Sequence, residues 1–179
     1  MKIRNTPILV IEETLALKVN DKVYEHSLRV KQICQNITTE LEANGLTVRK
    51  RLLDVGSLLH DIGKCEHCNI KYHHYISSAM MMNLFNCTKG KKNIRFAQRV
   101  QSLILSHKGA FCPHPCVAKE AAILRMADKI DHFVRKKDDS KKYERNLNIV
   151  EQYFKALGLE GFEELKNACD SVKESYDKR

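Results

Sequence analysis

The sequence predicts an all-α protein, and three observations support this fold class. Glycine and proline are scarce, with 7 and 3 residues in a chain of 179, so few positions interrupt helices. Apolar residues recur at helical spacing, as at Val30, Ile33 and Ile37. No stretch shows a convincing strand pattern. We therefore expect a compact bundle of helices around one core.

The helices can be placed in order along the chain. We expect them at residues 8–19, 22–43, 48–62, 72–85, 93–107, 116–134, about 147–157, and 162–176. Thr6, Asn20 and Thr47 are predicted to cap the first three, and Gly45 to end the second. The charged run 135–145 is interpreted as an exposed linker or a helix start. We expect a single domain over 1–179, with a motif-bearing core at about 22–135 and C-terminal helices at about 141–178.

Composition and charge restrict the possible environments and partners. The formal net charge of +9 suits an anionic ligand, although a basic solvated surface would explain it equally well. No apolar run is long enough to span a bilayer, and the patch at residues 8–11 is too short for a secretory signal. Seven cysteines without such a signal favour reduced thiols. We expect a cytoplasmic protein with no membrane partner.

A histidine and an aspartate stand side by side where an apolar run ends. His60 and Asp61 follow Leu59, and Gly63 and Lys64 come directly after them. Burying an imidazole and a carboxylate is costly unless something binds them, and both groups are common metal ligands. Lys64 adds a cation beside whatever the pair holds. This stretch is therefore the first candidate for a functional site.

Further histidines and an aspartate are expected to face inward. His26 shares the apolar stripe of residues 22–43, and Asp128 follows Leu124 by four residues. His73, His74 and His107 are other candidates near helix ends. Any one of them could be an ordinary hydrogen-bonded core residue. As a set they are hard to satisfy separately, whereas one or two divalent cations would satisfy them together.

This order of residues resembles the HD-domain metal-dependent phosphohydrolases. His60-Asp61-Ile62-Gly63 matches the HDIG variant of their motif, and residues 127–131 look like the family's closing segment. The family is all-α. The resemblance implies a first metal held by His26, His60, Asp61 and Asp128. It implies a second metal, where present, held by His74 and His107, with Asp61 bridging. His74 is preferred to His73 because of its spacing to Ser78 and Ala79.

The implied chemistry is hydrolysis of a phosphate ester or anhydride in a nucleotide or another small phosphorylated compound. A mixed imidazole and carboxylate set suits Fe, Mn, Zn, Co or Ni, and a bound ion would generate hydroxide at neutral pH. Lys64 is the best candidate to stabilise the charge on the phosphoryl oxygens. Arg29, Lys108, Arg125 and Lys129 are the other candidates to bind substrate. Asp131 could orient a ligand histidine or contact substrate.

Two cysteine pairs suggest a separate site. Cys65 and Cys68 form a CxxC pattern, and Cys112 and Cys116 form a CxxxC pattern. Together they could hold a structural zinc ion with four thiolates. Otherwise they are loop thiols that could be sensitive to oxidation.

Two other classes of function remain open. The same ligands would serve an HD-type diiron oxygenase, which the resemblance also allows. A non-enzymatic module could bind nucleic acid through the basic surface. That second alternative leaves the buried histidines and aspartates without a purpose, and no helix-turn-helix or aromatic RNA-binding signature supports it. A small phosphorylated substrate is therefore the favoured partner.

Overall fold

The computed structural model describes residues 2–64, 70–85, 87–136 and 140–178, and in these residues it contains helices and no strand. The α-helices are α1 (Ile8–Ala16), α2 (Asp21–Ala43), α3 (Lys50–Leu59), α4 (His73–Leu84), α5 (Lys91–Ser106), α6 (Ala118–Lys136), α7 (Ser140–Ala156) and α8 (Phe162–Asp177). Two 3₁₀ turns, Ile70–Tyr72 and Pro115–Val117, precede α4 and α6. The all-α prediction is confirmed. No described helix has both the length and the apolar character needed to cross a membrane.

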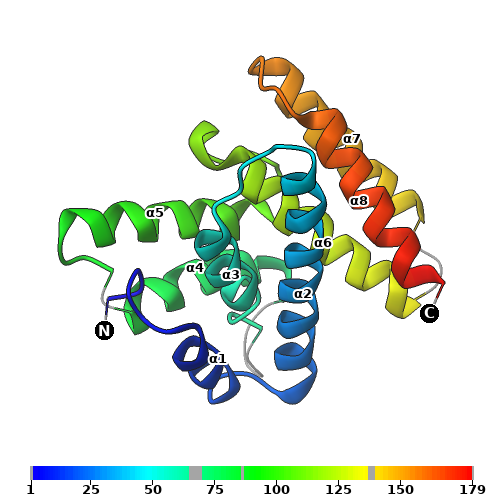
Figure 1. Cartoon of the computed structure of the whole chain (residues 1–179). Helices are drawn as coiled ribbons and strands as arrows, with labels where there is room; N and C mark the ends of the chain where they lie inside the picture. Colours follow the sequence, from blue (N-terminus) through cyan, green and yellow to red (C-terminus); the bar gives the residue numbers. More distant parts are fainter. Residues whose placement is uncertain (1, 65–69, 86, 137–139, 179) are drawn as a thin grey trace.

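Helix α2 runs through the middle of the bundle (Figure 1) and packs against α3, α6 and α8. Its apolar stripe, which includes Val30, Ile33 and Ile37, is completely or almost completely buried. Helix α5 packs against α3, α4 and α6. The hydrophobic effect of this shared core therefore holds together helices that are distant in the sequence.

The predicted helix ends are right where the local signal is strong. Asn20 Oδ1 accepts a hydrogen bond from the Val23 amide at 3.1 Å and caps α2. Gly45, with a φ of 79°, follows the end of that helix. The left-handed conformation suits glycine, which has no Cβ.

Two predicted caps are wrong. The Thr6 hydroxyl donates to the Lys2 carbonyl, and α1 begins after Pro7 without a side-chain cap. Helix α3 begins after Arg49 rather than after Thr47. The Arg49 amide donates to the carboxylate of Glu120 at 3.1 Å. A contact with a distant helix therefore helps to set the start of α3.

Helix α7 begins at Ser140, seven residues before the expected range. Its buried face includes Tyr143, Asn146, Leu147 and Val150, which recur at helical spacing. The last part of the charged run 135–145 is therefore a helix start. This was one of the two interpretations of the run, the other being an exposed linker. Because α7 packs against α6, its first turns lie beside the helix that carries Asp128.

Candidate metal centre

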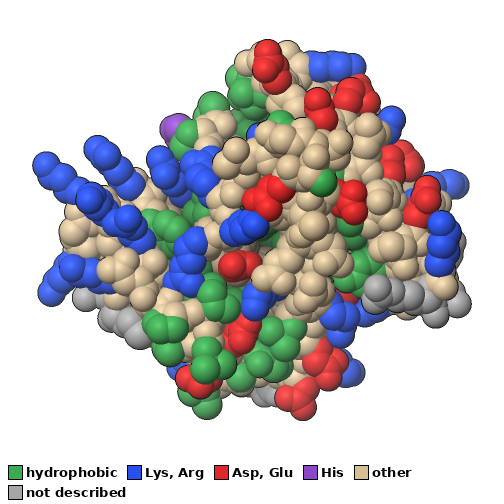
Figure 2. Space-filling model, in the orientation of Figure 1, with side chains coloured by type: hydrophobic (Ala, Val, Ile, Leu, Met, Phe, Trp, Pro, Cys, Tyr) green, Lys and Arg blue, Asp and Glu red, His purple; other side chains and the backbone are tan. Residues whose placement is uncertain are grey.

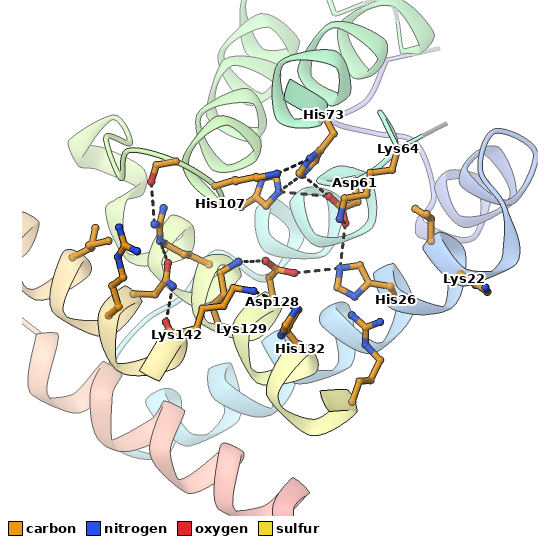
Figure 3. Close-up of a pocket in the computed structure, with 18 residues that line it drawn as sticks. Lys22, His26, Asp61, Lys64, His73, His107, Asp128, Lys129, His132 and Lys142 are labelled. Atoms are coloured by element: carbon orange, nitrogen blue, oxygen red, sulfur yellow. Dashed lines mark hydrogen bonds and ion pairs between the residues drawn. The ribbon is translucent and has the colours of Figure 1, made fainter. Parts of the chain in front are cut away.

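Five helices direct imidazole and carboxylate groups to one point in the bundle (Figure 3). His26 comes from α2, and Asp128 comes from α6. His60 and Asp61 follow the end of α3, His73 begins α4, and His107 follows α5. These last four residues, which follow helix ends or begin a helix, are completely or almost completely buried. Helix ends at this depth need polar partners, which the cluster provides.

The first part of the cluster surrounds His26. His26 Nε2 lies 3.2 Å from Asp61 Oδ2 and 3.2 Å from Asp128 Oδ1. His60 Nε2 lies 3.3 Å from His26 Nε2 and 4.0 Å from Asp128 Oδ1. The four residues that the resemblance assigns to a first metal are therefore brought together.

The second part of the cluster lies on the other oxygen of Asp61. His73 Nε2 is 2.9 Å from Asp61 Oδ1, and His107 Nε2 is 3.5 Å from the same atom. The two Nε2 atoms are 3.0 Å apart. Asp61 therefore lies between two groups of imidazoles and presents one carboxylate oxygen to each.

The backbone fixes how two of these rings are protonated. His60 Nδ1 lies 2.7 Å from the Ser57 carbonyl, and His107 Nδ1 lies 2.5 Å from the Ile104 carbonyl. Because a carbonyl only accepts, each Nδ1 must carry a proton and donate it. The neutral ring then presents a lone pair at Nε2, toward the centre of the cluster.

The unpaired atoms of the cluster fit a cation. Asp61 Oδ1 is buried and has no hydrogen-bond partner of acceptable geometry, although two imidazole nitrogens lie close to it. Ligand atoms of His26, His60 and Asp128 lie within 4.8 Å of one another, as do those of His60, Asp61 and His107. Converging lone pairs and carboxylate oxygens repel each other unless a positive charge lies between them. The donor set therefore suits one or two divalent ions.

His26 and His60 differ in the direction in which the protein shifts their pKa values. Burial opposes a charged His26, but hydrogen bonds with Asp128, Asp131 and Asp61 outweigh it and raise the pKa of His26 to about 10. Burial lowers the pKa of His60 to about 3. Without a metal, His26 therefore carries the positive charge that the neighbouring aspartates require. A divalent cation would replace that charge and release a proton.

The aspartates of the cluster are held in the ionised form. Burial alone would raise the pKa of Asp61, but His60, His107 and the other imidazoles hold it well below the ordinary value. Lys129 and His26 do the same for the pKa of Asp128 against the effect of burial. Ionised carboxylates are the form that binds divalent metals.

Asp131 positions His26 through the ring nitrogen Nδ1, which faces away from the centre of the cluster. Its Oδ2 lies 2.7 Å from His26 Nδ1, and its Oδ1 accepts a hydrogen bond from Arg29 Nε at 2.7 Å. Arg135 Nε also donates to Asp131, at 2.8 Å. This chain orients the imidazole and keeps its Nε2 directed at the centre. It favours the interpretation of Asp131 as the group that orients a ligand histidine.

The structure brings His73, and not the preferred His74, against Asp61. His74 stacks beside Tyr75 at a ring-centroid distance of 4.1 Å, and its buried Nδ1 has no hydrogen-bond partner. Burial lowers the pKa of His74 to about 4. Consecutive residues of a helix point about 100° apart, so the two side chains cannot both face Asp61. The preference drawn from the spacing to Ser78 therefore disagrees with the geometry.

Gly63 allows α4 to approach the turn that carries Asp61. A Cβ on Gly63 would lie 2.6 Å from the His73 carbonyl oxygen and 2.6 Å from the Ser77 amide nitrogen. The Gly63 amide donates to the Ser77 hydroxyl at 2.8 Å. Any larger residue would push the start of α4 outward. The glycine of the motif therefore keeps His73 near Asp61.

A cavity of about 600 Å³ opens over the cluster and is strongly cationic. Lys64 and Lys129 line it and form ion pairs with Asp61 and Asp128 respectively. Lys108 also lines it, with Nζ 3.4 Å from His73 Nδ1. Three of the residues expected to contact substrate are therefore beside the candidate metal ligands.

The two expected arginines have other contacts. Arg29 does not line the cavity, because it donates to Asp131. Arg125 lines it, but its guanidinium donates to Asn146 Oδ1 and to the Ser106 and Gly109 carbonyls at 2.8–3.0 Å. These bonds connect α6 to α7 and to the backbone on both sides of His107. For Arg29, the geometry indicates a positioning residue rather than a substrate contact.

Sequence reasoning missed four cations in the cavity wall, namely Lys22, Arg135, Lys142 and Arg145. Two of them belong to α7, where residues 142, 145, 146 and 149 all line the cavity. Their spacing of three, four and seven residues is that of one helix face. The signal was present in the sequence, but part of it lay in the charged run 135–145, which was interpreted as an exposed linker or a helix start.

The proposed four-thiolate zinc site can be followed only in part. Cys112 and Cys116 are exposed free thiols. Cys65 and Cys68 lie outside the described residues. The structural zinc therefore stays a prediction.

Comparison with known proteins agrees with this geometry. The HD domain family model matches residues 23–132, a span that contains every residue of the cluster. Searches of curated proteins and of solved structures found no match. Members of this family are generally metal-dependent hydrolases, and the chain belongs to the HD domain family.

Proposed function

We propose that the protein is a metal-dependent phosphohydrolase that cleaves a phosphate ester or anhydride in a small compound such as a nucleotide. The observation that carries this proposal is the cationic cavity over the cluster of imidazoles and carboxylates. Among the described residues that line the cavity, eight are Lys or Arg, and Asp61 and Asp128 are the only acidic ones. Such a cavity favours a phosphorylated substrate over a neutral one.

His26, His60, Asp61 and Asp128 would hold one ion, and Asp61, His73 and His107 would hold a second. When bound, such ions lower the pKa of coordinated water toward neutrality and polarise a phosphoryl oxygen. His60 and His107 contribute by keeping Nε2 unprotonated, and Asp131 contributes by fixing the ring of His26. Asp61 contributes to both halves and is therefore the most sensitive position.

Lys64, Lys108 and Lys129 would bind the phosphoryl group of the substrate. All three line the cavity beside the ligand residues. Phosphoryl transfer spreads negative charge over the phosphoryl oxygens, so positioned cations stabilise the transition state. A volume of about 600 Å³ is in the usual range for sites that bind small molecules. A nucleotide-sized compound would fit such a cavity.

A panel of phosphomonoesters, nucleoside phosphates and dinucleoside polyphosphates would test the proposal. Purified protein is loaded separately with Mn, Fe, Co, Ni or Zn, and release of phosphate or nucleotide is measured. We expect turnover of at least one substrate class, abolished by a chelator and by Asp61→Asn. Oxygen consumption by the iron-loaded protein, without hydrolysis of any substrate, would contradict the proposal and favour the oxygenase alternative.

A further inference from the structure

A group of exposed cations surrounds the N-terminal end of α5, far from the cavity. We call it the α5 basic patch, and it consists of Lys2, Arg4, Lys89, Lys91, Lys92, Arg95 and Arg99, all of them exposed. Lys and Arg side chains project from this edge of the molecule in Figure 2, on the left where Figure 1 places the start of α5. His107, at the other end of α5, is about 24 Å away along the helix axis, at 1.5 Å per residue.

Nothing in the described part of the chain neutralises these charges. The sequence has no Asp or Glu between Glu66 and Glu120. None of the seven side chains takes part in an ion pair between described residues. The Arg4 amide donates to Asn93 Oδ1 at 3.2 Å and fastens the N-terminal segment to α5. The two segments together line a hollow of about 330 Å³.

The charges are also placed against the helix dipole. Lys91 and Lys92 occupy the first turn of α5, which has no acidic residue, and Gly90 provides no side-chain cap. The N-terminus of a helix carries partial positive charge, so cations there are unfavourable. The fold keeps an arrangement that an anionic partner would stabilise.

The spacing and the surroundings of the patch suggest which anion it fits. Lys91, Arg95 and Arg99 follow one another at four-residue intervals on one helix face, about 6 Å apart per step. This is a straight row, suited to the repeated charges of a polymer. Ile94 and Phe96 are partly buried, so the patch offers neither apolar anchors for a lipid surface nor a stacking platform for unpaired bases.

We propose that the α5 basic patch binds double-stranded nucleic acid through its phosphate backbone. The contacts are electrostatic and go to phosphates, which carry no sequence information, so we expect binding to depend little on base sequence. The patch and the cavity lie at opposite ends of α5, so binding does not require the metal centre. This binding surface would exist even if the cavity accepted no phosphorylated substrate.

Fluorescence anisotropy with the full-length protein and a chelator tests this proposal. The probes are labelled 24-base-pair RNA and DNA duplexes, single-stranded RNA of equal length, and vesicles containing phosphatidylserine. The test variant carries Lys91→Glu, Arg95→Glu and Arg99→Glu. The control carries Lys18→Glu, Lys155→Glu and Lys178→Glu, which change the net charge equally at exposed positions elsewhere. Circular dichroism verifies that both variants are folded.

We expect the natural protein to bind duplex more tightly than single strands or vesicles. The test variant should bind the duplex at least about tenfold more weakly, and the slope of log affinity against log salt should decrease by about three, one for each lost phosphate contact. The control should change affinity less than about threefold, as expected for net charge alone. Equal loss in both variants, no duplex binding, or tighter binding to vesicles or to single strands would overturn the proposal. Retained hydrolysis by the test variant would separate this surface from the proposed catalytic cavity.

Discussion

The two ends of α5 treat charge in opposite ways. At its C-terminal end, His107 is buried, its Nδ1 donates to the Ile104 carbonyl, and its Nε2 faces Asp61 and His73. At its N-terminal end, Lys91 and Lys92 are exposed and lack an acidic partner in the first turn. At one end of this helix the protein fixes the polar groups through hydrogen bonds. At the other end the charged groups are exposed to solvent.

The comparison shows how burial distinguishes two kinds of binding site. Buried groups must be satisfied by precise partners, so a change of a single atom there should have large effects. Exposed cations interact weakly with each other through water, so single changes there should have small effects that add up. The predictions below test this contrast, beginning with the largest effect.

The largest effect is expected for Asp61→Asn. The amide keeps the shape of the side chain but removes the charge that both groups of imidazoles share. We expect hydrolysis to fall at least about a thousandfold, because loss of bound metal removes several kcal/mol of transition-state stabilisation. Metal content measured by mass spectrometry should fall in parallel. Full activity together with full metal content would show that Asp61 is not a metal ligand.

The second prediction compares neighbouring histidines of α4. His73→Ala should lower turnover by about 100-fold or more, because it removes a ring 2.9 Å from Asp61 Oδ1. His74→Ala should change turnover by less than about fivefold, because that ring faces Tyr75. Steady-state kinetics at saturating metal separates the two. The reverse order would restore His74 as the ligand that the sequence spacing favoured.

The third prediction concerns the residue behind His26. Asp131→Ala should weaken metal affinity by about 10–100-fold, the usual cost of losing a group that orients a ligand. Asp131→Asn should recover part of this loss, because its amide oxygen can still accept from His26 Nδ1. Isothermal titration with Mn²⁺ measures both affinities. If the asparagine and alanine variants bind equally, orientation of His26 is not the role of Asp131.

The fourth prediction compares Gly63, which lies against the backbone of α4, with Gly56, which lies against a side chain of α5. Gly63→Ala places a Cβ 2.6 Å from backbone atoms of α4, which cannot rotate away. We expect a loss of about 1–3 kcal/mol in the free energy of unfolding, together with lower activity. Gly56→Ala is the control, since its Cβ would meet the flexible Leu103 side chain at 2.9 Å. Urea denaturation should show a smaller change for Gly56→Ala.

The smallest effect is expected at the exposed end of α5. Lys91→Glu puts a favourable charge in the first turn, so we expect the free energy of unfolding to rise by about 0.3–1 kcal/mol. Thermal unfolding at low salt measures the change, and added salt should reduce it. Lys155→Glu, in the last turn of α7, is the contrasting control, because it removes a favourable charge at a helix C-terminus and the ion pair with Glu151, so it should not stabilise the protein. Destabilisation by Lys91→Glu would mean that Lys91 has an intramolecular role.

Much of the fold and part of the site could be read from local patterns. Helical periodicity identified the buried stripe of α2, and Asn20 and Gly45 marked its ends. The pair His60 and Asp61 stood out because polar groups so close to an apolar run need partners. These features depend on residues near in sequence, so the chain alone carries them.

Other features of the site could not be predicted from local patterns, because they depend on packing between helices. Whether His73 or His74 faces Asp61 follows from where α4 begins and how closely Gly63 lets it approach. Arg29 turns to Asp131 and not to the cavity because α2 and α6 lie side by side. The cations of α7 reach the cavity for a similar reason. The sequence by itself determined which helices form and which chemical groups they carry, and only the tertiary structure decided which of those groups meet, because such contacts are made through space between residues far apart in the chain.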